Sequence, residues 1–164
     1  MNPEAKYIDH YIQDGFVKIC DVDPSAVYEW QYTDIHKLMF STHNSWVYFI
    51  TLDDEVVKIG ETGQPLGIEM SDGQPKKGTQ CRLGRYRTGD GTDSVVRREL
   101  KEDISKGRTV SIWALKCPIY TSKQKVGGRV VQIDTTTHKS LELTYIDYFE
   151  SQVGSKPLLN KGRK

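Results

Sequence analysis

An acidic side chain inside an apolar helical stripe is the first candidate for chemistry in this sequence. Near the C-terminus, apolar residues recur at spacings of three and four, which predicts a helix with one buried face around Glu150. The stripe consists of Leu143, Ile146, Phe149 and Val153. A carboxylate on such a face is costly unless it binds something there, so Glu150 is a candidate site residue. The open alternative is an acid at the rim of the stripe that pairs with an Arg or Lys.

The formal charge of +1 hides an uneven distribution along the 164 residues. Residues 1–75 contain 4 Lys and Arg against 13 Asp and Glu, a net −9, whereas residues 76–164 contain 19 against 9, a net +10. Phosphate binding needs clustered Lys and Arg rather than a high global pI, so the second half predicts an anionic partner, nucleic acid first. The alternative is a bipolar protein whose halves neutralise each other or pair head to tail.

Length and composition restrict the class of protein. A chain of this size is expected to form one domain with a sizeable core. It contains no run of 18 apolar residues and no signal-peptide pattern, so a cytoplasmic protein is the simplest expectation. The cysteines are odd in number and scattered, and the histidines lack metal-ligand spacing, which argues against a disulfide framework and a zinc site. These residues are Cys20, Cys81, Cys117, His10, His36, His43 and His138.

The chain is expected to divide into an N-terminal helical extension over 1–44 and a core over 45–164. Asp23 and Pro24 predict the start of a helix in the extension, because Asp is a good N-cap and Pro a good first helical residue. The apolar side of this helix is Val27, Tyr28, Trp30, Ile35 and Leu38. We expect it to pack on the core that follows.

The core is predicted to be α+β (α/β in the broad sense), with a small central antiparallel sheet of about three strands flanked by helices. Its predicted elements are a β-hairpin over 46–51 and 55–59, a mobile loop over 63–79, helices over 82–87 and from 92 or 93 to 107, a half-buried strand over 109–115, and a helix from Ser140 to Val153. An inserted β-hairpin is predicted at about 118–138, where the pair Gly127-Gly128 suits a tight turn between two basic strands.

Two segments of the first hairpin resemble the motifs of one enzyme superfamily. Trp46-Val47-Tyr48 and Lys58-Ile59-Gly60 are similar to the two half-motifs of the GIY-YIG nucleases, of which the first ends in Tyr and the second in Gly. The sequence departs from the family where Trp46 replaces the first Gly and Lys58 replaces the first Tyr of the second half-motif. The resemblance covers about residues 46–115 and 141–160, and it implies a GIY-YIG-like fold.

Four later residues extend the resemblance. Arg82, with Tyr86 four residues on, resembles the catalytic Arg of the family and the Tyr or His that follows it. Arg85 stays an alternative for the catalytic arginine, although the spacing to Tyr86 favours Arg82. Glu150 stands where the family carries its single metal-binding Glu, and Asn160 resembles the closing Asn.

The resemblance implies a metal-dependent DNA endonuclease of restriction or phage type, with one Mg²⁺ or Mn²⁺ per active site held by Glu150. Phosphodiester hydrolysis needs a polarised water, a cation at the phosphate and help for the leaving oxygen. A lone carboxylate can hold one Mg²⁺ that keeps most of its waters, and Arg82 offers a forked donor to a phosphate oxygen. Tyr48 is expected to orient or deprotonate the attacking water. The assisting residues are expected to be Lys58, Tyr86 and Asn160.

Each candidate also has a purely structural interpretation. Tyr48 is then a packed strand aromatic, Lys58 a solvent-facing strand residue and Asn160 a turn former. The three arginines at 82, 85 and 87 are then only a phosphate-contacting surface.

Double-stranded DNA is the expected partner, and a double-strand cutter with one site per chain suggests a homodimer or higher homo-oligomer. The residues expected to contact DNA are Lys76, Lys77, Arg85, Arg87, Lys123, Lys125 and Arg129. Two other functions stay open: a non-catalytic nucleic-acid-binding module on the same fold, and a protein-interaction domain whose basic half meets an acidic partner.

Overall fold

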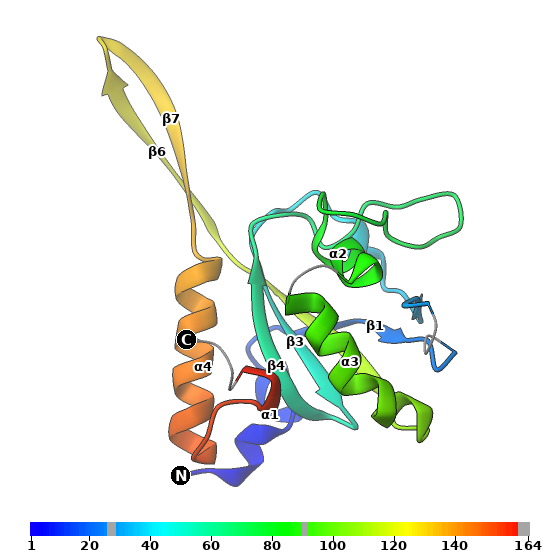
Figure 1. The fold of residues 1–164 in the computed structure, drawn as a ribbon. Coiled ribbons are helices and arrows are strands. Elements are labelled where there is room, and N and C mark those ends of the chain that lie inside the picture. The colour runs from blue at the N-terminus through cyan, green and yellow to red at the C-terminus, as the bar shows by residue number, and fades with distance from the viewer. Residues whose placement is uncertain (26–28, 90–91, 161–164) are drawn as a thin grey trace.

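The centre of the fold is a five-stranded antiparallel sheet with the strand order β2-β1-β5-β3-β4 (Figure 1). The structure is a computed structural model, and it describes residues 1–25, 29–89 and 92–160. The strands are β1 (Val17–Val22), β2 (Tyr32–Thr33), β3 (Trp46–Leu52), β4 (Glu55–Thr62) and β5 (Val110–Lys116). The α+β class and the antiparallel sheet are confirmed, but the sheet has five strands instead of the expected three.

Helices cover both faces of this sheet. The helices are α1 (Asp9–Ile12), α2 (Arg82–Thr88), α3 (Thr92–Ser105) and α4 (His138–Val153), with 3₁₀ turns at Pro3–Lys6, Lys37–Phe40 and Leu158–Asn160. Tyr48 and Ile50 of β3 point into the core beneath α2 and α3, while Val47 and Phe49 point into the core beneath α1 and α4. All of β3 is buried, because an uninterrupted apolar run suits a strand that is covered on both faces.

The β3–β4 hairpin forms as predicted. Asp53 and Asp54 both have a positive φ, 47° and 70°, which the two central residues of a type I′ turn require. The Asp53 carboxylate accepts a hydrogen bond from the backbone N–H of Thr109 at 2.9 Å, which ties the turn to the start of β5. The register pairs Tyr48 with Gly60, so the two half-motifs lie side by side on adjacent strands.

The helix predicted from Asp23 is wrong for the described residues. The Asp23 carboxylate accepts hydrogen bonds from the N–H and the hydroxyl of Ser25 at 2.9 and 2.8 Å, which is a local turn that replaces helix capping. The segment before residue 45 supplies β1 and β2 to the sheet in addition to α1 and two 3₁₀ turns. Of the predicted apolar side, Trp30 is buried and Ile35 and Leu38 pack partly buried against the core. Val27 and Tyr28 lie outside the described residues.

The remaining core elements lie close to their predicted positions. α2 and α3 are confirmed, and residues 63–81 contain no helix or strand beyond an isolated bridge between Glu69 and Pro75. The strand expected over 109–115 is present, but β5 lies between β1 and β3 and buries most of its residues, so it is not half-buried. α4 begins before the expected Ser140 and ends at Gly154, whose φ is 97°.

The predicted basic hairpin is confirmed as a separate two-stranded sheet of β6 (Ile119–Val126) and β7 (Arg129–Thr136). Gly127 and Gly128 form its turn with φ values of 58° and 80°. In Figure 1 this ribbon projects away from the body of the molecule between β5 and α4. Within the described part of the chain, no helix has the length and apolar character needed to cross a membrane.

Candidate active site

Tyr48 and Gly60 form the floor of the candidate site. The Tyr48 side chain crosses the neighbouring strand directly above Gly60, and a Cβ built on Gly60 would overlap the phenol ring. Only glycine leaves room for this crossing. The Tyr at the end of the first half-motif and the Gly at the end of the second are therefore required together, since each occupies the other's space.

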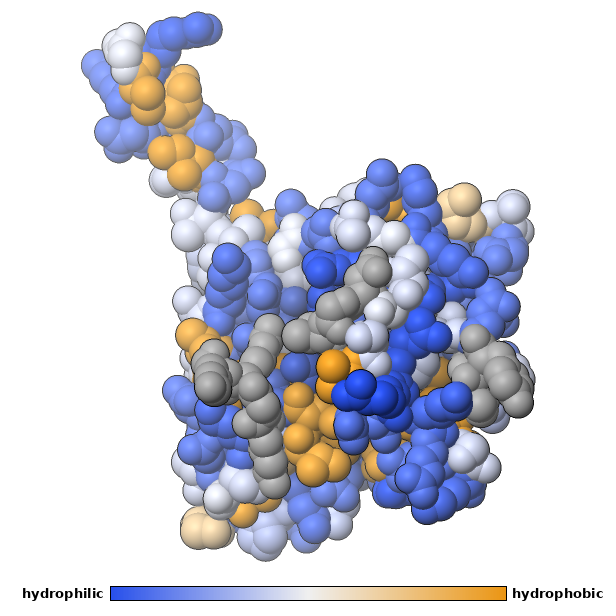
Figure 2. All heavy atoms as spheres, in the orientation of Figure 1, coloured by the Kyte–Doolittle hydropathy of each residue, from blue (hydrophilic) through white to orange (hydrophobic). Residues whose placement is uncertain are grey.

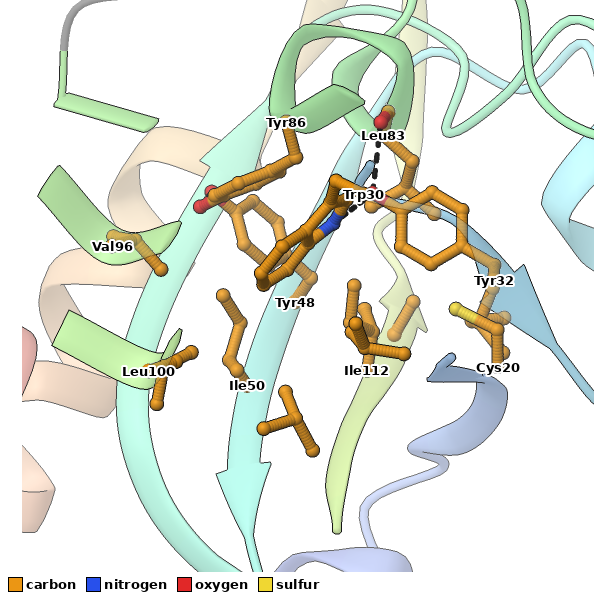
Figure 3. Close-up of a cluster of buried hydrophobic side chains, with 14 of the residues drawn as sticks. Cys20, Trp30, Tyr32, Tyr48, Ile50, Leu83, Tyr86, Val96, Leu100 and Ile112 are labelled. Carbon is orange, nitrogen blue, oxygen red and sulfur yellow. Dashed lines mark hydrogen bonds between the residues drawn. The ribbon is translucent and has the colours of Figure 1, made fainter. Parts of the chain in front are cut away.

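Arg82 lies above this floor and joins two phenols. From α2, its Nε and Nη2 donate to the Tyr48 hydroxyl at 2.9 and 2.6 Å, and the Tyr86 hydroxyl lies 2.9 Å from that of Tyr48. Tyr86 is one helical turn after Arg82, so both side chains leave α2 on the same side. The close-up of the core in Figure 3 shows Tyr48 and Tyr86 facing each other between β3 and α2. Three residues that were predicted as site residues therefore meet in one hydrogen-bonded cluster.

Sequence reasoning missed Asp93 as a member of this cluster. The sequence placed it only at the possible start of a helix, but its carboxylate accepts from Arg82 Nη2 at 3.0 Å. The Asp93 side chain is only 2% exposed, and Arg85 Nε lies 3.8 Å from its other oxygen. The sequence did contain one indication of this role. Asp93 is an acid in the first turn of α3, the helix that directly follows the arginine-bearing helix α2.

The charges of the cluster follow from burial and proximity. Burial raises the pKa of the Tyr48 phenol above its ordinary value, although the Arg82 charge acts in the opposite direction. Burial likewise raises the pKa of Tyr86 well above its usual range. Burial alone would lower the pKa of Arg82, but its neighbours Tyr48, Tyr86 and Asp93 together raise it. At neutral pH the two phenols of the cluster are therefore neutral, and Arg82 is a cation.

Lys58 and Asn160 complete the edge of the sheet beside the cluster. Lys58 is 6% exposed and stands two residues before Gly60 on β4, so it lies on the same face of the sheet as Tyr48. It has interactions within the molecule and is not a solvent-facing strand residue. Asn160 accepts from the N–H of Ile59 at 2.8 Å and donates to its carbonyl at 2.9 Å. This amide pairs with the free edge of β4 as another strand would.

The carboxylate that faces the sheet from α4 is Glu142 and not Glu150. Glu142 is 7% exposed, whereas Glu150 is exposed, so the inward orientation expected for Glu150 is wrong. Leu143, also expected to be buried, is 60% exposed. The buried side of α4 consists of His138, Glu142, Ile146 and Phe149.

Glu142 lies level with the half-motif of β4. His138 fixes the first turn of α4, because its Nε2 lies 3.3 Å from the Glu61 carboxylate and its Nδ1 lies 3.0 Å from the Ser45 hydroxyl. α4 packs along β4 and runs in the opposite direction (Figure 1). Glu142 is one turn further, about 6 Å along the helix, which corresponds to about two residues along a strand. This places it beside Ile59, while Glu150 lies about 12 Å beyond.

The residues expected to contact DNA are not equivalent. The Arg87 side chain is 4% exposed and donates to the carbonyls of Trp30 and Pro75 at 3.2 and 2.7 Å, so its expected surface role is wrong. Lys77 is exposed and pairs with Glu29 at 3.1 Å. Arg85 and Lys76 are half-buried, and the ribbon residues Lys123, Lys125 and Arg129 are exposed.

Metal ligands are sparse in this region. Among the residues that the structure describes, no three His, Cys, Asp or Glu side chains lie close enough to hold an ion together. The three cysteines are free and buried. A metal at this site would depend on a single carboxylate and on water.

The arrangement of the whole chain resembles two solved nuclease structures. A mutant of bacteriophage T4 EndoII matches with a TM-score of 0.60 and 16% identity, over 88% of this chain and 96% of that one. The restriction endonuclease Hpy188I, solved with product DNA, matches with a TM-score of 0.52 and 17% identity, over 97% of this chain and 87% of that one. Both are GIY-YIG nucleases.

This chain has a GIY-YIG-like fold. No family model matches its sequence, and no curated protein sequence does. The likeness to the two solved structures is therefore one of fold, at 16% and 17% sequence identity. In this GIY-YIG-like fold the two half-motifs are the paired strands β3 and β4, with Lys58 at the position where the sequence departs from the family.

Proposed function

We propose that the chain is a metal-dependent deoxyribonuclease that hydrolyses phosphodiester bonds of double-stranded DNA at preferred sites. The observation that carries this proposal is the cluster of Tyr48, Arg82 and Tyr86, with Lys58 on the same sheet face and Glu142 on α4, the helix that packs along β4. A cation, hydroxyl groups and a carboxylate are the groups that this hydrolysis needs. The fold likeness to two endonucleases, one of them solved with product DNA, supports the substrate class.

Arg82 is proposed to bind a non-bridging oxygen of the scissile phosphate. Its Nε and Nη2 are held by Tyr48 and Asp93, while its Nη1 has no hydrogen-bond partner among the described residues. A guanidinium that is fixed on one side keeps its remaining donors in a defined direction. Its geometry favours Arg82 over Arg85 as the catalytic arginine, because Arg85 does not contact Tyr48.

Tyr48 is proposed to orient the attacking water. Its pKa is raised chiefly by burial, so its hydroxyl keeps the proton at neutral pH. A protonated phenol holds a water by hydrogen bonding but is a poor base. This narrows the sequence-based expectation, which included deprotonation, to orientation. Lys58 and Tyr86 are proposed to assist at the same water or at the phosphate, and Asn160 to keep β4 in place.

Glu142 is proposed to hold one Mg²⁺ or Mn²⁺ ion, in place of Glu150. A carboxylate oxygen is the ligand that Mg²⁺ prefers, and an ion bound by one carboxylate keeps most of its waters. A single buried carboxylate at Glu142 suits such an ion, since Mg²⁺ is usually held through one or two carboxylates and water. When bound, the ion supplies positive charge to the phosphate and makes a bound water more acidic.

The test compares Glu142→Gln with the matched variant Glu150→Gln on the same helix. Cleavage of supercoiled plasmid is measured in Mg²⁺, with EDTA as the blank, and DNA binding is measured by fluorescence anisotropy in EDTA. We expect Glu142→Gln to lose at least about 100-fold in cleavage rate, and Glu150→Gln to stay within about threefold of the wild type. Both variants should bind DNA normally. Wild-type cleavage by Glu142→Gln would overturn the assignment.

One observation favours the alternative of a non-catalytic nucleic-acid-binding module. The ion pair between Arg82 and Asp93 balances the charge of the candidate catalytic arginine and buries most of it. A binding module would bind DNA with a steep salt dependence but leave plasmid intact in both Mg²⁺ and Mn²⁺. Weak salt dependence of DNA binding would instead favour a protein-interaction domain.

A further inference from the structure

The ribbon of β6 and β7 has an unpartnered apolar surface. Every residue from 120 to 136 is exposed. In Figure 2 the ribbon stands clear of the body and carries a hydrophobic patch surrounded by hydrophilic atoms. An isolated two-stranded ribbon is marginally stable in water, and exposed apolar patches mark interaction surfaces.

The strand register divides the ribbon into two faces of different chemistry. Residues that are paired across an antiparallel ribbon project to the same face. The face that we call the apolar face contains the pairs Tyr120 with Thr135, Ser122 with Ile133, Gln124 with Val131, and Val126 with Arg129. The opposite face, which we call the basic face, contains Thr121 with Asp134, Lys123 with Gln132, and Lys125 with Val130. The DNA-contact candidates Lys123 and Lys125 therefore share one face, and Arg129 belongs to the other.

We propose that the apolar face is the interface between two copies of this chain, packed antiparallel about a twofold axis through the middle of the ribbon. Four large apolar side chains on this face are exposed by 63%, 56%, 37% and 41%, namely Tyr120, Val126, Val131 and Ile133. The proposal concerns association only and does not rest on the nuclease function.

The distribution of charge on the ribbon favours a second copy of the chain as the partner of the apolar face. Arg129 is the single charged residue of the apolar face, and it lies at the tip. In an antiparallel arrangement the two Arg129 side chains lie at opposite ends of the interface, so like charges do not meet. A polyanion would be drawn to Lys123 and Lys125 on the basic face instead.

The apolar faces of two copies can also pack against each other. In the antiparallel arrangement Tyr120 at the base of one ribbon lies opposite Val126 at the tip of the other. Val131 and Ile133 lie near the axis in both copies. The two basic faces then point outward, in opposite directions, and stay available to DNA.

The size of the interface indicates how high the protein concentration must be for the dimer to be detected. A ribbon of two eight-residue strands is about 27 Å long and 10 Å wide, so two facing ribbons cover on the order of 500 Å². Stable dimers bury at least about 1,200 Å². We therefore expect a weak dimer that forms only at high protein concentration.

The principal test uses two neighbouring valines that face opposite ways. Val131→Lys places a charge on the apolar face, and Val130→Lys places the same charge on the basic face. Sedimentation velocity over a range up to about 300 μM gives the association constant of each. We expect Val131→Lys to weaken association at least about tenfold, and Val130→Lys to change it less than about threefold. Circular dichroism checks that both variants are folded, which is expected because the ribbon lies outside the main core.

A second test uses cross-linking at the proposed axis. Ser122→Cys lies on the apolar face close to the axis, within reach of its own copy for a short thiol-reactive bis-maleimide, whereas Lys123→Cys points away, and the three native cysteines are buried. The reagent should yield a covalent dimer of Ser122→Cys only. A wild type that stays monomeric throughout, equal association of the two valine variants, or equal cross-linking of the two cysteine variants would each overturn the proposal.

Discussion

Replacing Asp93 by Asn tests whether a buried ion pair holds the candidate catalytic arginine. Arg82 and Asp93 lie 3.0 Å apart with side chains that are 13% and 2% exposed. Breaking a pair by neutralising one partner leaves the other charge in a poorly solvated place. We expect Asp93→Asn to fold but to have a clearly lower free energy of unfolding.

The magnitude follows from the geometry of the pair. The centres of the two delocalised charges lie about 4 Å apart and attract by about 4 kcal/mol at the effective dielectric of a protein surface. Asn keeps one hydrogen bond worth about 1 kcal/mol, while loss of an acid from the first turn of α3 costs about 0.5 kcal/mol more. The expected decrease in the free energy of unfolding is therefore about 3.5 kcal/mol, or about 7 to 14 °C in Tm for a chain of this length.

The assay is urea unfolding followed by circular dichroism, with Asp103→Asn as the matched control on the same helix. Asp103 pairs with Arg108 at the same distance, 3.0 Å, but these side chains are 29% and 41% exposed. An exposed pair contributes about 0 to 1 kcal/mol, so the control should be nearly neutral. If the two variants differ by less than about 1 kcal/mol, the buried pair does not stabilise the site and the reasoning fails.

Three other perturbations test the surroundings of the cluster. Gly60→Ala forces the Tyr48 ring to move, so plasmid cleavage should fall about 100-fold in a protein that is still folded; a loss below about threefold would contradict the close crossing. Asn160→Ala leaves both backbone groups of Ile59 unpaired, which should cost about 3 kcal/mol and expose the Ile59 amide to hydrogen exchange. If the Ile59 amide of this variant stays protected from hydrogen exchange, the Asn160 side chain does not hold β4 in place. Burial raises the folded pKa of Tyr48 and Tyr86 above the unfolded value near 10, so their contribution to stability is complete below that pH and lost as the pH rises above it. Phenolate absorbance should then rise together with unfolding, and independent titration of all tyrosines in the folded protein near pH 10 would contradict this.

The helix α4 illustrates where reasoning from local pattern stops. Its existence, its end at Gly154 and the burial of Ile146 and Phe149 followed from spacing and capping, but the orientation of its acidic side chains did not. A buried side that contains Ile146 and Phe149 can extend either to Leu143 and Glu150 or to His138 and Glu142. The contacts of His138 with Glu61 and Ser45 select the second, and both partners are distant in the sequence.

The N-terminal segment was misjudged for a related reason. The pair Asp23-Pro24 is compatible with a helix start and equally with a turn between strands. The turn forms because β1 gains two neighbours in the sheet, and that gain depends on β5, which lies far along the chain. Short strands receive most of their stability from such pairing.

The sequence by itself determined the β3–β4 hairpin, the helix that carries Arg82 and the exposed ribbon. All of these depend on turn residues and periodicities within a few positions of one another. Only the tertiary structure decided that Asp93 holds Arg82, that Asn160 clamps Ile59 and that Glu142 rather than Glu150 faces the sheet. Each of these depends on contacts between separate elements, and their geometry is set by how the helices pack against the sheet and not by any local preference.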